Sequence, residues 1–273
     1  MTTASILQLC LLFFAALLGG TLNSVAGGGS FISFPALIFT GVPAINANAT
    51  STVALWPGSV ASMWAYRKEL VEQYRLHRAF LFVLSGTSLI GGELGAQLLL
   101  HTPPATFVLL IPYLLLLATL LFTFSGNITH WLRARRASAS PELEVAAPKT
   151  SWLRLTGISL LQFIIATYGG YFGGGIGILM LATLGLMGME NIHEMNALKT
   201  LLTSFINGVA VVTFALRGTV VWPQAILMVV AAIIGGYGGA YYARKIDQRW
   251  VRFFVMLIGF SMTIYFFVRT YYP

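Results

Sequence analysis

Two short segments of this chain carry three consecutive glycines inside an otherwise apolar sequence. The triplets are Gly27–Gly29 and Gly173–Gly175, and the apolar runs that follow them are Phe31–Thr40 and Ile176–Met187. Both runs are shorter than the about 20 residues that a helix needs to cross a bilayer core. Backbone that breaks at membrane depth must line a polar cavity or be buried in protein. We therefore expect each triplet to interrupt a helix near the middle of a membrane.

A helix that starts at such a break presents free N–H groups and a partial positive charge at its first turn. We expect the helices after the triplets to begin at about Ser30 and Ile176, and to hold an anion between their first turns. Asn23, Ser24 and Ser30 could add neutral hydrogen-bond donors. The alternative is that the triplets only allow neighbouring helices to pack closely.

Close packing is the interpretation that we favour for a second kind of glycine pair. Gly91 and Gly95, and likewise Gly235 and Gly239, are spaced as Gly-x-x-x-Gly on unbroken apolar runs. This spacing is typical of contacts between membrane helices, because the missing side chains let two backbones approach each other.

Two ionisable residues lie within apolar runs, where a charge is costly. Lys199 stands just inside Ala197–Leu216, and Glu93 near the middle of Ala79–Leu100. Lys199 either supplies a positive charge to the anion site or extends to the lipid headgroups. Glu93 is either protonated or a proton-coupling group, and we retain it as the coupling candidate. The candidate substrate-binding residues are Asn23, Ser24, Gly27, Gly28, Gly29, Ser30, Gly173, Gly174, Gly175 and Lys199.

No other chemistry is indicated by the sequence. His193 is expected in a loop, and it has no partner at metal-ligand spacing. The chain contains no phosphate-binding loop with its lysine, no His-Glu-x-x-His and no paired acidic motif. We therefore predict no enzymatic activity, no cofactor and no metal site.

The amino-acid composition indicates the environment in which these candidate residues lie. Of 273 residues, 57% are hydrophobic and 9% are charged, whereas a soluble domain carries about 25% charged residues. The mean hydropathy is +0.81. These values exclude a disordered chain and argue against a soluble enzyme. The formal net charge is +8, but the basic residues lie in short gaps between apolar runs, which indicates a membrane partner and no nucleic acid.

The apolar runs predict an all-α polytopic membrane protein with about 8–10 membrane segments. Basic residues concentrate in the gap Arg67–Arg78, in the central linker and in Arg244–Arg252. The positive-inside rule places these gaps in the cytoplasm and both termini outside. The runs are Ser5–Leu22, Phe31–Thr40, Ala47–Tyr66, Ala79–Leu100, Ala105–Ser125, Leu153–Tyr168, Ile176–Met187, Ala197–Leu216, Val221–Ala243 and Val251–Val268.

Three landmarks recur in the same order in the two halves of the chain. They are the glycine triplets, then Asn-Ala-Thr-Ser or Asn-Ala-Leu-Lys ending at Ser51 or Lys199, and then Gly-Gly-Glu-Leu-Gly-Ala or Gly-Gly-Tyr-Gly-Gly-Ala. We predict a first transmembrane repeat at 1–125, a cytoplasmic linker at 126–152 and a second repeat at 153–273. Each repeat crosses the membrane an odd number of times, so the repeats are inverted. Inverted repeats with broken helix pairs favour a secondary transporter, and an anion channel is the alternative.

The segment LNSVAGGGSFISFPALIFTGVPAINANATSTVAL resembles the N-terminal signature of the sulfite exporter TauE/SafE family. The segment YGGYFGGGIGILMLATLGLMG, followed by Asn-Ala-Leu-Lys-Thr, resembles the second-half signature of that family. The resemblance implies a multi-pass inner-membrane transporter of sulfite or an organosulfonate, described with about eight membrane helices. Expected partners are a small sulfur-containing anion and the lipid bilayer, with a possible homo-oligomer. A proton- or cation-coupled exchanger that uses Glu93 is a further alternative.

Overall fold

The computed structural model describes residues 3–25, 28–137, 152–187, 189, 191–242 and 248–272. The described residues form helices and no strand, so the predicted all-α class is confirmed. Four helices are long and apolar enough to cross a membrane within the described ranges. The helices are α1 (Thr3–Val25), α2 (Ser30–Phe39), α3 (Ala44–Ala65), α4 (Arg67–His101), α5 (Pro104–Ala137), α6 (Trp152–Tyr171), α7 (Ile176–Met187), α8 (Ile192–Leu216), α9 (Trp222–Tyr242) and α10 (Gln248–Tyr271).

The two short helices begin where the glycine triplets predict. Helix α2 starts at Ser30 and α7 starts at Ile176. Helix α2 ends before Gly41, whose φ of +87° is readily adopted only by glycine. Because α2 and α7 are each preceded by a longer helix, the breaks separate a long and a short helix in both halves.

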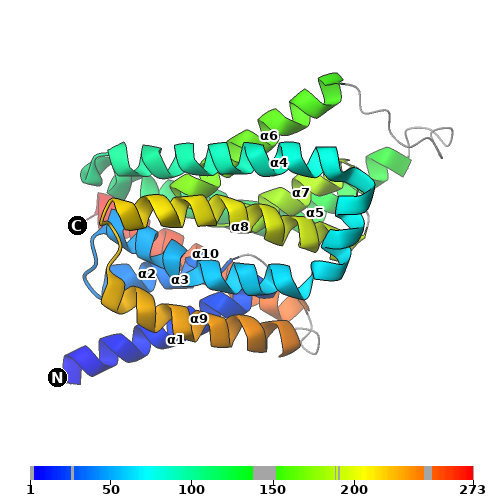
Figure 1. The fold of residues 1–273 in the computed structure, drawn as a ribbon. Coiled ribbons are helices and arrows are strands. Elements are labelled where there is room, and N and C mark those ends of the chain that lie inside the picture. The colour runs from blue at the N-terminus through cyan, green and yellow to red at the C-terminus, as the bar shows by residue number, and fades with distance from the viewer. Residues whose placement is uncertain are drawn as a thin grey trace.

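Two stretches expected as gaps are helical. The basic stretch from Arg67 to Arg78 forms the first turns of α4, and Figure 1 shows these turns crossing the end of the bundle before the helix runs along it. Arg, Lys, Glu, Gln and Leu are good helix formers, so high charge there does not mean a loop. Helix α5 also continues to Ala137, beyond the predicted boundary at 125. Residues 138–151 lie outside the described part, and the division into repeats and linker stays a prediction.

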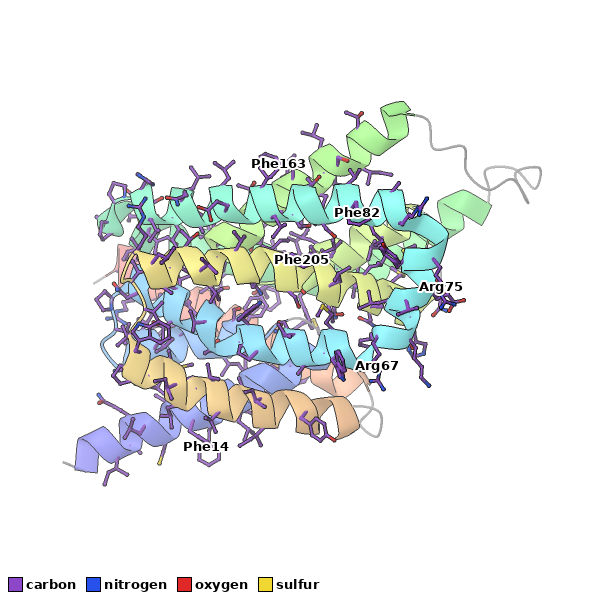
Figure 2. The ribbon with its side chains drawn as sticks, in the orientation of Figure 1. Phe14, Arg67, Arg75, Phe82, Phe163 and Phe205 are labelled. Carbon is purple, nitrogen blue, oxygen red and sulfur yellow. The ribbon has the colours of Figure 1, made fainter. Side chains whose placement is uncertain are left out.

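The chain termini and the connections between helices lie at the two ends of the helix bundle. Figure 1 shows both termini, and the connections α2–α3, α4–α5 and α8–α9, at one end. Arg67 and Arg75 lie at the opposite end, as Figure 2 shows. This is the arrangement that the charge pattern predicts, and which end faces the cytoplasm stays a prediction.

The helices pack with a two-fold internal correspondence. Helix α1 packs against α9, and α6 packs against α4. Helix α3 contacts α9, and α8 contacts α4, while α3 packs against α8 and α5 against α10. Exchanging the first five helices for the last five, in order, reproduces this set of contacts. The first helix of each half therefore lies against the fourth helix of the other half.

Glycines make the closest of these contacts possible. A Cβ atom added to Gly91 would lie 2.9 Å from the Phe163 carbonyl oxygen of α6. Added Cβ atoms at Gly95 and Gly235 would collide with backbone of α6 and α1, respectively. The packing interpretation is thus confirmed for these three residues, and Gly239 lies outside the residues whose side-chain surroundings are described.

Candidate functional site

A polar cavity lies between α3 and α8, where the first turns of α2 and α7 reach it. Ser30 contributes from the start of α2, Gly173 from the break before α7, and Ile176 from the start of α7. The cavity volume is about 30 Å³, and one water needs about 10–15 Å³. It therefore holds only a group of a few atoms unless the helices move. The lining residues are Asn23, Ser30, Thr52, Leu55, Ser59, Ser62, Gly173, Ile176, Gly177, Lys199, Thr200, Thr203 and Asn207.

The break before α7 depends on the backbone freedom of glycine. Gly173 and Gly175 have φ values of +75° and +74°, in the left-handed region that L-residues with a side chain rarely adopt. The Tyr168 hydroxyl donates a hydrogen bond to the Gly174 carbonyl oxygen at 2.7 Å, which ties the break to the end of α6. The chain can thus end one helix and redirect the next within a few residues.

The break before α2 depends instead on close approach. Gly29 has a helical φ of −59°. A Cβ atom on Gly29 would collide with the Gly19 carbonyl oxygen and lie 3.1 Å from the Asn23 Cβ atom. Glycine therefore allows α2 to begin directly against α1. Gly27 lies outside the described residues, and so does the side chain of Ser24.

Lys199 is the charged residue of the cavity. Its side chain is 3% exposed. Its Nζ atom has no hydrogen-bond partner within the part of the chain that the structure describes. A lysine that extends to the headgroups would expose its amine, so this geometry favours the cavity role. The matching residue of the first half, Ser51, is buried as well, but its hydroxyl pairs with that of Ser33 at 2.7 Å.

The hydroxyls around Lys199 divide into acceptors and donors. Thr200 and Thr203 donate to carbonyl oxygens of their own helix, at 2.9 and 2.7 Å. Thr52 and Ser62 do the same on α3. Each hydroxyl has one proton to donate, and in these four groups that proton is already used within the helix. They can therefore only accept further hydrogen bonds.

The remaining donors belong to a smaller set. Asn23 donates its side-chain amide to the Ser59 hydroxyl at 3.0 Å, which leaves the Ser59 proton free to donate. Within the described residues, Ser30 and Asn207 also line the cavity without a side-chain partner. Together with the Lys199 amine, these groups can donate to an oxyanion that enters between the helix starts.

Glu93 does not line this cavity. Its carboxylate accepts hydrogen bonds from the Gln97 side-chain amide, at 2.7 Å, and from the Thr213 hydroxyl. Thr213 belongs to α8, so Glu93 joins α4 to α8. No carboxylate is among the residues that line the cavity. The structure thus separates the coupling candidate from Lys199.

Of the other predicted site residues, the structure brings Asn23, Ser30, Gly173 and Lys199 to the cavity. Gly28, Gly29, Gly174 and Gly175 belong to the breaks but do not line it. An added Cβ atom would meet the Phe172 ring at Gly174, at 2.8 Å, and Ala118 at Gly175, at 3.3 Å. These last two glycines therefore shape the break and face protein.

Six polar lining residues were missed in the sequence analysis, and a helical spacing could have found them. On α3 the residues Thr52, Ser59 and Ser62 recur on one face of the helix, and on α8 Thr203 and Asn207 recur four residues apart. Polar positions with this period inside an apolar helix indicate a polar cavity. The missed residues are Thr52, Ser59, Ser62, Thr200, Thr203 and Asn207.

The expectation that His193 lies in a loop is wrong. His193 is in the first turn of α8, where its backbone N–H donates to the Asn191 side chain at 3.0 Å, a helix cap. The described residues contain no group of three His, Cys, Asp or Glu side chains that could hold a metal ion.

The sequence of this chain matches a known protein family. A sequence model described as sulfite exporter TauE/SafE matches residues 12–266. A probable membrane transporter protein of Haemophilus influenzae is 28% identical, over 93% of this chain and 92% of that protein. The probable membrane transporter protein YfcA of Escherichia coli K12 is 27% identical, over 94% and 88%. The probable membrane transporter protein ORF9 of a Sinorhizobium species is 25% identical, over 94% and 91%. No solved structure matches the chain.

Proposed function

The chain belongs to the sulfite exporter TauE/SafE family of membrane transporters, and from this premise we propose that it is a secondary carrier of a small oxyanion, sulfite or a small organosulfonate. The observation that carries the proposal is the Lys199 amine, which has no hydrogen-bond partner among the described residues and is buried at a cavity that two helix starts reach. An anion there would receive charge-assisted hydrogen bonds from the amine and electrostatic stabilisation from both helix dipoles.

The absence of carboxylates from the lining supports an anionic substrate over a cationic one. A cation carrier would need acidic or carbonyl-rich ligands, whereas the groups around this cavity are an amine, amides and hydroxyls. The small volume favours sulfite over longer organosulfonates, since three oxygens on one sulfur are the most compact of these anions.

The inverted correspondence between the halves supports alternating access. If the halves exchange conformations, a cavity at their interface opens to one side and then to the other around a fixed site. The contacts of α3 with α9 and of α8 with α4 are corresponding contacts of this kind. If the α3–α9 contact loosened while the α8–α4 contact tightened, the cavity would close on one side of the membrane and open on the other.

Flux into proteoliposomes tests the proposal. We expect sulfite and methanesulfonate to enter with saturable kinetics and to show accelerated exchange when unlabelled anion is inside. A flux that stays linear with concentration and shows no exchange would assign an anion channel. Turnover of the anion to a product, without accumulation, would assign an enzyme.

We also propose that the protein lies in the inner membrane with both termini outside. In a Cys10→Ser background, single cysteines at Thr102 and Ala139 should react with an impermeant reagent from opposite sides. Labelling of both from one side would reject the inverted arrangement. Cys10 is exposed and would otherwise contribute its own signal.

A further inference from the structure

We propose that Lys199 carries the coupling proton of transport: its amine is neutral while the cavity is empty and takes up a proton when the anion binds. One proton would then cross with each anion. This inference rests on the proposed carrier function and extends it, because it names the coupling ion and the residue that holds it.

The first support is the scarcity of ionisable side chains on the helices that pack against α8, which are α3, α4, α6 and α7. Helices α3 and α7 contain no ionisable side chain at all. Helix α4 has none between Arg78 and Glu93, and its other acidic residues, Glu69 and Glu72, lie in its first two turns. On α6, the Tyr168 hydroxyl is already engaged by the Gly174 carbonyl oxygen. Within the part of the chain that the structure describes, no carboxylate accepts a hydrogen bond from the Lys199 amine.

The second support is that two carboxylates on or bound to α8, Glu194 and Glu93, have other partners. Glu194, on α8 itself, accepts from the Gln73 side chain at 2.7 Å and from the Asn191 side chain at 2.8 Å. Glu93 is bound at Thr213, which lies about 20 Å along α8 from Lys199. Neither carboxylate neutralises the buried amine.

A protonated amine without a partner is strongly disfavoured once it is removed from water, whereas a neutral amine is not. The empty cavity must pass through a closed state between its two open states. That passage is feasible only with the neutral amine. When an anion is present, the ammonium and the anion neutralise each other, so the loaded cavity closes with the proton bound.

The proposed transport cycle balances both protons and charge. On the side where the cavity is open, the amine accepts a proton from water as the anion enters. On the opposite side the anion leaves, and the proton returns to water. For a monovalent anion the loaded and the empty cavity carry the same net charge, so no net charge crosses the membrane.

Methanesulfonate is the probe that tests this, because it is a monovalent anion that does not titrate near neutral pH. A proton on the transported species must then reside on the protein. In proteoliposomes we expect accumulation of about tenfold for each pH unit of gradient. We expect no response to a potassium-diffusion potential, whereas an anion moving without a proton would accumulate about 50-fold per 100 mV.

Two variants assign the proton to Lys199. In Lys199→Arg the charge is permanent, so exchange of labelled for unlabelled anion should continue while net uptake slows by roughly 100-fold or more. In Lys199→Gln the pH gradient should no longer drive accumulation. Lys68→Gln, an exposed lysine at the start of α4, is the matched control and should behave as wild type.

The outcomes separate the two proposals. Flux that follows voltage and ignores the pH gradient in the wild type would overturn the coupling role and leave the carrier intact. Absence of any sulfite or methanesulfonate flux would overturn the carrier itself. The wild-type measurement alone decides coupling, so a variant that fails to fold does not prevent the test.

Discussion

Both halves of the molecule contain the sequence Gly-Gly-Gly before a short helix, but glycine is required there for different physical reasons. In the second half, Gly173 and Gly175 hold left-handed backbone that other residues resist. In the first half, Gly29 is helical, and its missing side chain admits the backbone of Gly19. Corresponding places in the two halves therefore require glycine without requiring the same conformation.

The charged position differs in the same way. Ser51 and Lys199 occupy matching places in the sequence. Ser51 is hydrogen-bonded to Ser33 and does not line the cavity, whereas Lys199 lines it with no hydrogen-bond partner among the described residues. One half supplies a closed hydrogen-bonded contact, and the other supplies the charge. The two halves thus correspond in their helix packing and differ in the chemistry of this position.

The largest effect is expected from removing that charge. Lys199→Gln keeps an unbranched side chain, shorter by one bond, and an N–H donor but loses the ammonium, so anion affinity should fall by about 1–3 kcal/mol. Equilibrium binding of sulfite to the purified protein measures the change. A variant that binds normally would reduce Lys199 to a structural residue and erase the asymmetry between the halves.

The next effect concerns packing in the first half. Gly29→Ala places a methyl group against the Gly19 backbone, which cannot move aside as a flexible side chain could. Overpacking of this kind costs about 1–3 kcal/mol. Thermal unfolding followed by size-exclusion chromatography should show the loss, and Gly86→Ala, where an added Cβ meets nothing within 4 Å, is the control.

A somewhat smaller effect is expected in the second half. Gly173→Ala forces a side chain onto left-handed backbone, at about 1–2 kcal/mol. Because Gly173 also lines the cavity, anion affinity should fall together with stability. Equal losses in Gly29→Ala and Gly173→Ala, with affinity unchanged in both, would contradict the different roles of the two breaks.

The smallest effect belongs to the counterpart of Lys199. Ser51→Ala removes the hydrogen bond with Ser33, which is worth about 0.5–1.5 kcal/mol of stability. Anion affinity should be unchanged, since Ser51 does not line the cavity. Reduced affinity in a stably folded Ser51→Ala variant would show that the first half also takes part in binding.

Much of the fold could be predicted because membrane helices are long and apolar. The starts of α2 and α7 at Ser30 and Ile176 follow from glycine triplets beside short apolar runs. The helical start of α4 was missed, because charges were interpreted as a gap although the residues that carry them favour helix. The distinction between Gly29 and Gly173 could not be predicted, since a glycine triplet specifies neither torsion angles nor neighbours.

The site was predictable where a residue type is unusual for its surroundings. Lys199 and Glu93 were both singled out as charges within apolar runs, but the sequence alone does not say which of them reaches the cavity. That depends on helix rotation and on long-range contacts, such as the pairing of Glu93 with Thr213 across 120 residues of chain. Hydroxyl residues such as Thr203 gave weaker signals, because threonine satisfies itself on its own helix.

The exchanged packing of the halves has a consequence for how the chain is made. Helix α1 rests on α9 and α4 rests on α6, so the first helix leaves the ribosome long before the helix that covers it. Until the second half is inserted, the glycine-rich faces of α1 and α4 must remain against lipid or an assisting insertion factor. Maturation therefore waits for nearly the whole polypeptide, and a nascent chain stalled after α5 should be a substrate for membrane proteolysis.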